Sequence, residues 1–241
     1  ASPPARCIAR RISITSSVRF QNCGRNAPSR ARWPNPVLDE VLYQTPNAEE
    51  APEVDGDEWP LPATNPPIMI PGIAADDSLY PVEKIEAHVR GLHHLALSVF
   101  VFSKNEVGEL ELLIQRRAFE KYHCGGQWAN TCCTHPHFGE EAKPAAARRL
   151  TEELGFTVPI REQRIVEYSA DVGGGLWERE RVHMFRADVD RADVKLDLNP
   201  EEVCEARWIS ADSLKAEMLA TPRDFTPWFR IYLNRYPNLD F

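Results

Sequence analysis

The most regular hydrophobic pattern in the chain lies between residues 92 and 114. Residues 92–102 (LHHLALSVFVF) and 110–114 (LELLI) are rich in aliphatic and aromatic side chains, and Ser98 is the single polar break between Leu95 and Phe102. Such runs predict two buried strands. The polar segment 104–108 (KNEVG) separates them, so we expect a hairpin.

A helical period replaces the strand pattern over residues 140–154. Ala146, Leu150 and Leu154 recur every four residues and would form one apolar stripe along a helix. Gly155 follows at the position where a C-terminal cap is expected. This is the clearest helix that the sequence predicts.

The remaining periodic segments predict three strands and two helices. The strands are expected over 163–170, 181–189 and 203–209. One helix, capped by Ser210 or Asp212, should extend through Leu219. The other should span 228–235, because Thr226-Pro227 is a cap followed by proline at the first helical position. Strands on both sides of one clear helix in the sequence, followed by two helices near the C-terminus, indicate an α+β sandwich.

Composition changes near residue 70. Residues 1–38 carry seven arginines and no acid, residues 39–58 carry eight acids and no base, and twelve of the 20 prolines lie before residue 72. Such a segment buries too little apolar surface to offset its ordering entropy, so we expect residues 1–67 to be a disordered extension and 68–241 the folded domain. An arginine-rich, acid-free start is also typical of an organellar transit peptide, the alternative to a dispensable extension.

The whole chain is acidic, with 28 Lys and Arg against 36 Asp and Glu and a formal net charge of −8. Nonspecific nucleic-acid binders are normally basic, so no nucleic-acid partner is expected. The longest apolar stretch, 95–102, is far shorter than the roughly 18 residues of a membrane span, and none is expected. Six cysteines, two of them adjacent, do not suit a disulfide-stapled secreted domain. A cytoplasmic location is expected, or an organellar one if the leader is a transit peptide.

Candidate chemistry is concentrated in residues 128–137 (WANTCCTHPH). Side chains of an extended backbone alternate, so Cys133, His135 and His137 would project from one face and Cys132 from the other. A thiol and imidazoles would then share one side. The alternative is a structural zinc site built from the cysteines, Cys124 included, and the histidines, although the paired CxxC spacing of such sites is missing.

Three further clusters could bind a metal ion or phosphate. Arg149 and Glu153, four apart on the expected helix, combine a phosphate-binding guanidinium with a carboxylate, although the same spacing is an ordinary helix ion pair. Glu178 and Glu180 alternate onto one side of an extended segment, as solvated acids also do. The third cluster lies before and within the first strand: His88, His93 and His94. Together these groups would supply a mixed nitrogen and oxygen shell suited to Mn, Zn or Fe.

Four motifs follow one another in an order that points to a known family. They are WANTCCTHP with Cys133, RRLTEELGF over 148–156, Glu178-Arg179-Glu180, and FTPW over 225–228. Over about residues 68–241 the chain thereby resembles type I isopentenyl-diphosphate delta-isomerase, a member of the Nudix superfamily. The resemblance implies a Nudix-type α/β/α sandwich with a mixed sheet. It also implies conversion of isopentenyl diphosphate to dimethylallyl diphosphate through a tertiary carbocation.

The Nudix signature GX5EX7REUXEEXGU, with U aliphatic, aligns with residues 134–156. It meets Thr134 where glycine is expected and Arg149 where the second glutamate is expected. Many Nudix hydrolases use that glutamate in attack of water on a diphosphate, so its replacement argues against hydrolysis. An arginine there is similar to one that contacts the diphosphate in the isomerases. A Nudix hydrolase is the alternative, and a noncatalytic zinc-stapled binding module is the third class.

The resemblance also implies roles for individual residues. Cys133 and Glu180 would exchange protons on opposite faces of the substrate, in either direction, with Tyr168 assisting Glu180 and Trp228 stabilising the cation. The diphosphate-binding bases would be Lys84, Arg117, Lys121 and Arg149. The ligands of one tightly bound ion, Mn²⁺ or Zn²⁺, would be His88, His94, His135, Glu178 and Glu180.

Two further points concern single residues of the implied metal sites. The spacing from His88 to His94 is one residue shorter than in the family, which makes His93 a substitute ligand. Glu153 would bind a second ion, Mg²⁺, against the diphosphate. The expected partner is therefore a small allylic or homoallylic diphosphate, and the sequence carries no signal of oligomeric state.

Overall fold

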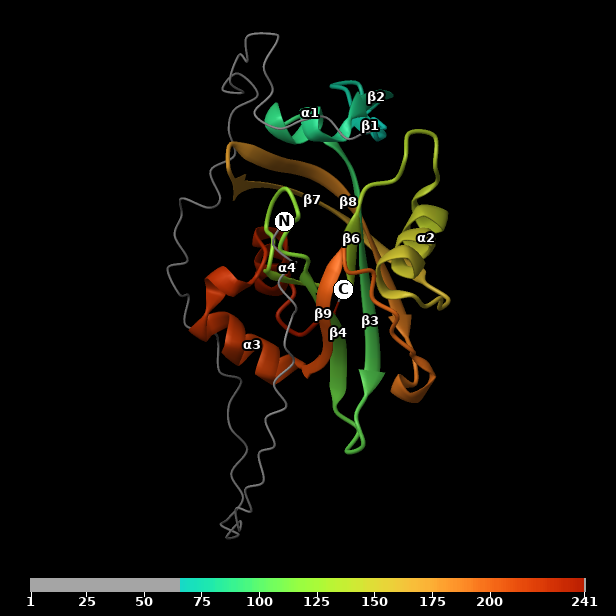
Figure 1. The fold of residues 1–241 in the computed structure, drawn as a ribbon, viewed down its shortest axis with the longest axis vertical. Coiled ribbons are helices and arrows are strands. Elements are labelled where there is room, and N and C mark those ends of the chain that lie inside the picture. Colours follow the sequence, from blue (N-terminus) through green and yellow to red (C-terminus); the bar gives the residue numbers. More distant parts are fainter. Residues whose placement is uncertain (1–65, 241) are drawn as a thin grey trace, which may run out of the picture. The chain divides into compact units, whose positions relative to one another are not determined.

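The computed structural model describes residues 66–240 (Figure 1). The strands are β1 (Met69–Ile73), β2 (Leu79–Glu83), β3 (His94–Lys104), β4 (Leu110–Arg117), β5 (Trp128–Ala129), β6 (Cys132–Thr134), β7 (Arg161–Gly173), β8 (Leu176–Asp188) and β9 (Val203–Ser210). The helices are α1 (Lys84–Val89), α2 (Ala142–Leu154), α3 (Ala211–Ala220) and α4 (Pro227–Arg235). Short 3-10 turns occupy Arg191–Asp193 and Pro222–Asp224.

Strand β3 organises a mixed sheet. It pairs antiparallel with β1, β4 and β6, and parallel with β8 from His94 opposite Glu180 to Phe102 opposite Asp188. The long hairpin of β7 and β8 extends the sheet on one side, and β9 pairs with β4 on the other. The mixed sheet expected from the sequence is confirmed.

Both faces of this sheet are covered by helices, which explains why the β3 sequence is apolar almost throughout. Phe100 and Phe102 pack in one apolar layer with Phe229 of α4. Val99 and Val101 point to the opposite face and pack in a second layer with α2. Figure 1 shows α2 on one side of the sheet and α3 and α4 on the other, so the α/β/α sandwich is confirmed.

Most predicted elements are present, with shifted ends. The hairpin of β3 and β4 forms with Phe102 opposite Leu112, and α2 ends at Gly155 in a left-handed conformation with φ 76°. Ser210, not Asp212, caps α3 by accepting a hydrogen bond from the Ser213 backbone. The start predicted for the 181–189 strand is wrong, because β8 begins at Leu176. After Leu176 and Trp177, residues 178–181 (ERER) are charged, yet Glu178 and Glu180 are buried within the β7–β8 hairpin.

Residues 66–93 are more regular than their sequence suggests. Strands β1 and β2 pair in register from Met69 opposite Glu83 to Ile73 opposite Leu79, and α1 follows. Prolines and a glycine in these strands conceal the period of two, so no strand was expected there. The disordered or targeting extension predicted for residues 1–67 falls outside the described residues, apart from 66 and 67. Within residues 66–240, no helix combines the length and apolar character needed to cross a membrane.

We expect Gly155→Ala to lower the free energy of unfolding by about 2–4 kcal/mol, measured by urea denaturation. A Cβ atom at this left-handed position would lie 2.5 Å from both Cβ and the carbonyl oxygen of Asp197. Gly108→Ala is the matched control, because Gly108 also has a positive φ (83°) but no atom within 4 Å of the added Cβ. Equal losses in the two variants would contradict the packing argument.

Candidate active site

One cavity brings together side chains from eight helices and strands and from the loops between them. All eight residues predicted for catalysis or diphosphate binding line it: Cys133, Glu180, Tyr168, Trp228, Lys84, Arg117, Lys121 and Arg149. His135 and Glu178 also line it. The other predicted ligands, His88, His94 and Glu153, are buried beside it. The fold therefore gathers residues that lie up to 144 positions apart in the sequence, from Lys84 to Trp228.

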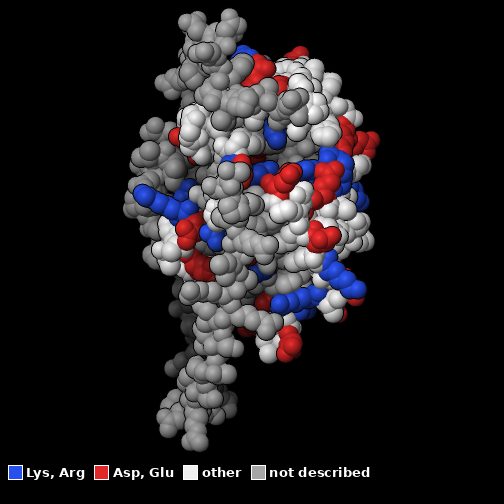
Figure 2. Space-filling model, in the orientation of Figure 1, with Lys and Arg blue, Asp and Glu red and all other residues white. Residues whose placement is uncertain are grey.

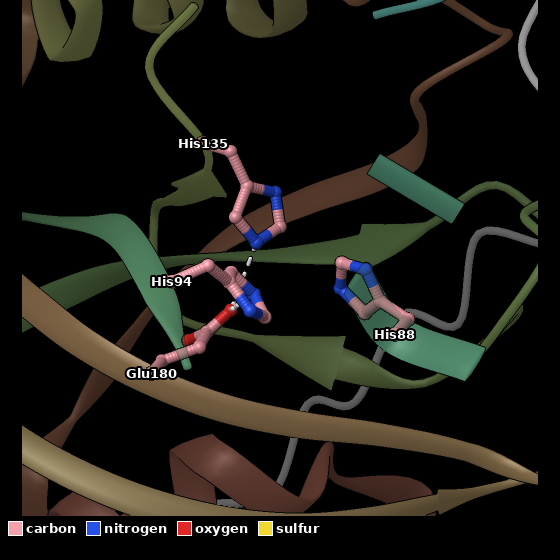
Figure 3. A group of neighbouring side chains, drawn as sticks. All are labelled: His88, His94, His135 and Glu180. Carbon is pink, nitrogen blue, oxygen red and sulfur yellow. Dashed lines mark hydrogen bonds and ion pairs between the residues drawn. The ribbon is translucent and has the colours of Figure 1, made fainter. Parts of the chain in front are cut away.

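Four potential metal ligands converge next to the cavity (Figure 3). His88 comes from α1, His94 begins β3, His135 follows β6, and Glu180 lies in β8. The parallel register of β3 and β8 sets His94 directly opposite Glu180. The ligand atoms of the four residues lie within 4.8 Å of one another.

Hydrogen bonds fix two of these imidazoles in a metal-binding orientation. Nδ1 of His88 lies 2.6 Å from the Lys84 carbonyl oxygen, and Nδ1 of His94 lies 2.7 Å from the Leu92 carbonyl oxygen. Each Nδ1 therefore carries a proton, and each Nε2 keeps its lone pair. Both Nε2 atoms are buried without a hydrogen-bond partner. This is the usual arrangement of metal-bound histidine, so the residues fit a divalent ion.

His93 does not share this position. Its Nε2 lies 3.9 Å from Glu167, and its side chain is partly exposed. The structure thus groups His94, and not the substitute His93, with His88 and His135.

Glu178 and Glu180 occupy alternate positions of β8 and are both buried. The Tyr168 hydroxyl lies 2.8 Å from Glu178 Oε2 and is also within hydrogen-bond distance of Glu180 Oε2. Burial and the nearby Glu180 charge raise the pKa of Glu178 well above its usual value. Burial acts in the same direction on Glu180. The His135 hydrogen bond and the His94 ring, whose Nε2 lies 3.5 Å from Glu180 Oε1, outweigh burial and hold the pKa of Glu180 well below its usual value.

His135, like Glu180, belongs to the metal-ligand group and also lines the cavity. Its Nε2 lies 2.9 Å from Glu180 Oε1 (Figure 3). Burial lowers the pKa of His135 to about 4 although the Glu180 hydrogen bond opposes this shift. The ring is therefore neutral near pH 7, the form that ligates a metal ion.

The Cys133 thiol is held by two polar neighbours. Its Sγ donates to Asn130 Oδ1 at 2.7 Å and lies 3.3 Å from Ser98 Oγ, which in turn lies 3.1 Å from the Tyr232 hydroxyl. The Asn130 amide is oriented by donating to the Val99 and Cys132 carbonyls, so its oxygen can only accept. Burial raises the pKa of Cys133 to about 12. The group is thus a protonated thiol in the cavity.

Two sequence expectations around Cys133 are corrected. Cys132 points into the apolar layer beneath α2, as expected, but His137 is exposed and does not join Cys133 and His135. The extended segment ends with β6 at Thr134, so the alternation does not continue to residue 137. Within residues 66–240 no cysteine belongs to a potential metal-ligand group, which removes the basis for a structural zinc site.

Three basic side chains, Lys84, Lys121 and Arg149, lie close to one another and form the basic end of the cavity. Arg149 donates to Glu153 Oε1 at 2.7 Å and to the Thr134 hydroxyl at 3.1 Å. Burial, with the nearby Lys121 charge, lowers the pKa of Lys84 to about 8. On the face shown in Figure 2, acidic and basic side chains are interspersed over the described surface.

Glu202 is a cavity residue that the sequence analysis missed. Its carboxylate pairs with Lys121 and lies 3.2 Å from Arg149 Nη2. It thus neutralises two bases where an anionic substrate group would bind. Its position in a turn before β9 gave no periodic signal.

Other cavity residues that the sequence analysis missed include Ser98, His123 and Tyr232. Ser98 carried a signal, because it is the one polar residue in the apolar run of β3 and lies opposite Cys133 in the β3–β6 register. His123 lies in the loop between β4 and β5, where no pattern marks its side chain as buried.

Comparison of the sequence with known proteins identifies the family of this chain. The NUDIX domain family matches residues 92–229. An isopentenyl-diphosphate Delta-isomerase from Cereibacter sphaeroides is 54% identical over 157 residues, which cover 64% of this chain and 85% of the relative. Another from Ruegeria pomeroyi is 49% identical over 175 residues, 72% of this chain and 93% of the relative. The chain is therefore a NUDIX-domain protein of the isopentenyl-diphosphate Delta-isomerase family.

Proposed function

We propose that this chain isomerises isopentenyl diphosphate to dimethylallyl diphosphate. The observation that carries the proposal is the lining of one cavity. A thiol and a buried carboxyl pair line it, and three of its four basic side chains cluster around Glu202. The thiol and carboxyl pair can move protons, and the basic cluster can bind a diphosphate.

The reaction adds a proton to one end of an unactivated alkene and removes another two carbons away. It passes through a tertiary carbocation, which water would trap. Cys133 and Glu180 are the proposed proton-exchanging groups, because both line the cavity and Tyr168 links Glu180 to the second carboxyl group. One group gives a proton to the alkene and the other takes a different proton from the substrate. The donor must therefore regain a proton and the acceptor must lose one, by exchange with water, before the next turnover.

Trp228 is the proposed stabiliser of the cation. Its side chain is buried, lines the cavity and offers an aromatic face, whose negative quadrupole attracts a developing positive charge. The Arg117 guanidinium lies 5.3 Å from the centre of its ring. Arg117 thus connects the aromatic wall to the basic end of the cavity.

The basic end would bind the diphosphate. Arg149 and Lys121 are already oriented by Glu202, and an incoming diphosphate would replace that carboxylate as their anionic partner. Glu153 is buried beside Arg149, and Gln115 Nε2 donates to its Oε2 at 3.1 Å. We assign Glu153 to a Mg²⁺ ion bound together with the substrate, because Mg²⁺ prefers carboxylate and phosphate oxygens.

The group of His88, His94, His135 and Glu180, with Glu178, would hold a second, tightly bound divalent ion, Mn²⁺ or Zn²⁺. When bound, such an ion supplies positive charge that offsets the buried carboxylates and sets the protonation of Glu180. The chain itself supplies the orientation of the imidazoles through the Lys84 and Leu92 carbonyls.

The hydrolase alternative lacks a group that it would need. Arg149 stands where many Nudix hydrolases place a glutamate, and its guanidinium forms ion pairs with Glu152, Glu153 and Glu202. A cation at this place favours binding the diphosphate over activating water against it. The buried Cys133 thiol has no role in hydrolysis.

We expect the purified chain, incubated with isopentenyl diphosphate and Mg²⁺ in deuterated water, to form dimethylallyl diphosphate that carries deuterium. Cys133→Ser and Glu180→Gln should each lower kcat by about 10²–10⁴-fold, the usual contribution of a general acid or base. Mass spectrometry measures the deuterium in the product, and an assay of released phosphate measures hydrolysis. Cys204→Ser is the matched thiol control, because Cys204 does not line the cavity.

Two results would contradict this proposal. Release of phosphate without labelled dimethylallyl product would indicate hydrolysis. Near wild-type turnover in both Cys133→Ser and Glu180→Gln, with retained metal content, would show that the proton-exchanging groups are wrong.

The pKa of about 8 for Lys84 predicts a pH-dependent diphosphate affinity. Lys84 is charged below this value and loses its charge as the pH rises through it, whereas the guanidinium in Lys84→Arg stays charged. The Kd of the wild type for inorganic pyrophosphate, divided by that of Lys84→Arg, should rise by up to about tenfold between pH 7 and pH 9. Isothermal titration calorimetry measures both constants, and the ratio cancels the ionisation of pyrophosphate. A constant ratio would show that Lys84 does not contact the anion.

A further inference from the structure

A second group of potential metal ligands adjoins the first. It consists of His88, His123 and Glu178, all buried, with ligand atoms within 4.8 Å of one another. The group shares His88 with the cluster of His94, His135 and Glu180. His123 has no role in the function proposed above.

The shared histidine decides whether the two groups hold one ion or two. His88 Nδ1 is occupied by its hydrogen bond to the Lys84 carbonyl, so only Nε2 can ligate. A neutral imidazole nitrogen has one lone pair and binds one metal ion. The two groups therefore either compete for His88 or contract around one shared ion, because their ligand atoms do not all lie within 4.8 Å of one another.

The contact between His123 and Glu178 fits two ligands of one ion better than a hydrogen bond. His123 Nε2 lies 3.6 Å from Glu178 Oε1. This is too long for a hydrogen bond. Two atoms that each bind one ion at about 2.1 Å can be separated by up to about 4.2 Å. The distance lies within that limit.

The surroundings of His123 hold its ring in place. Tyr122 contacts the ring edge to face at 4.3 Å between centroids, Trp228 does so at 5.9 Å, and His88 stacks at 5.5 Å. The backbone carbonyl of His123 accepts a hydrogen bond from Arg117 at 3.2 Å. The side chain is 4% exposed, and its Nδ1 has no hydrogen-bond partner.

We propose that His123 is a ligand of the same tightly bound divalent ion, which rests on the metal binding in the proposed function. The complete donor set is then four imidazoles and two carboxylates: His88, His94, His123, His135, Glu178 and Glu180. Six donors exceed the four of a structural zinc site. The shell therefore favours an ion that accepts six nitrogen and oxygen donors, such as Mn²⁺ or Co²⁺, over Zn²⁺.

X-ray absorption spectroscopy on the full chain loaded with Co²⁺ tests the proposal. The multiple-scattering signal from metal-bound imidazole rings gives the number of histidine ligands. We expect four imidazoles in the wild type and three in both His123→Phe and His123→Gln. His123→Phe fills the volume of the ring, and His123→Gln keeps a hydrogen-bonding group beside Glu178. The exposed His137 provides the control, since His137→Gln should retain all four.

Metal affinity separates a ligand from a residue that only orients Glu178. Loss of an outer partner of a ligand typically weakens metal binding about 10- to 100-fold. We expect the Kd for Mn²⁺, measured by titration of the free-ion electron paramagnetic resonance signal, to rise more than about 100-fold in both His123 variants. Restoration of wild-type affinity by His123→Gln would overturn the proposal.

The number of metal-bound imidazoles in the wild-type protein tests the proposal even if both His123 variants fail to fold. Three imidazoles in the wild-type protein would overturn the proposal. Four imidazoles in a protein that does not isomerise isopentenyl diphosphate would support the His123 ligand and refute the proposed function instead.

Discussion

Burial of two carboxyl groups, Glu178 and Glu180, is the constraint on which the rest of the site depends. An ionised carboxylate removed from water costs several kcal/mol unless a partner compensates it. In this chain the compensation comes from the Tyr168 hydroxyl, from His135, and, in the proposed function, from a divalent ion. The same negative charge explains why so many imidazoles converge on one end of the sheet. In the proposed function, proton transfer and metal binding are therefore coupled through one pair of side chains.

The sheet imposes the positions of these groups. The parallel pairing of β3 with β8 sets His94 beside Glu180, and the antiparallel pairing of β3 with β6 sets Ser98 beside Cys133. A shift of one residue in either pairing would turn the reactive side chains into an apolar layer. The helix α2 contributes differently, because its exposed edge carries Arg149 to the basic end while its buried face packs on the sheet. Catalysis and stability thus rely on the same alternation of side chains.

Local patterns predicted much of this fold, and their failures have physical causes. The apolar run of β3 and the four-residue repeat of α2 are strong signals, because burial on two faces or on one stripe dictates residue type directly. The start of β8 was not predicted, since its buried positions hold Glu178 and Glu180 and so read as polar. The motifs identified the thiol, the carboxyl pair and the bases, whereas His123 and Glu202 lie in loops and reach the site only through tertiary packing.

The proposed function requires one cavity that binds a metal ion at one end and a diphosphate at the other. The most direct test is a crystal structure of the full chain with Mn²⁺ and inorganic pyrophosphate, with the ion located by its anomalous scattering. The account predicts an anomalous peak among His88, His94 and His135, and pyrophosphate against Arg149 and Lys121 with Glu202 displaced. An ion bound elsewhere, or pyrophosphate outside the cavity that Cys133 and Glu180 line, would contradict it.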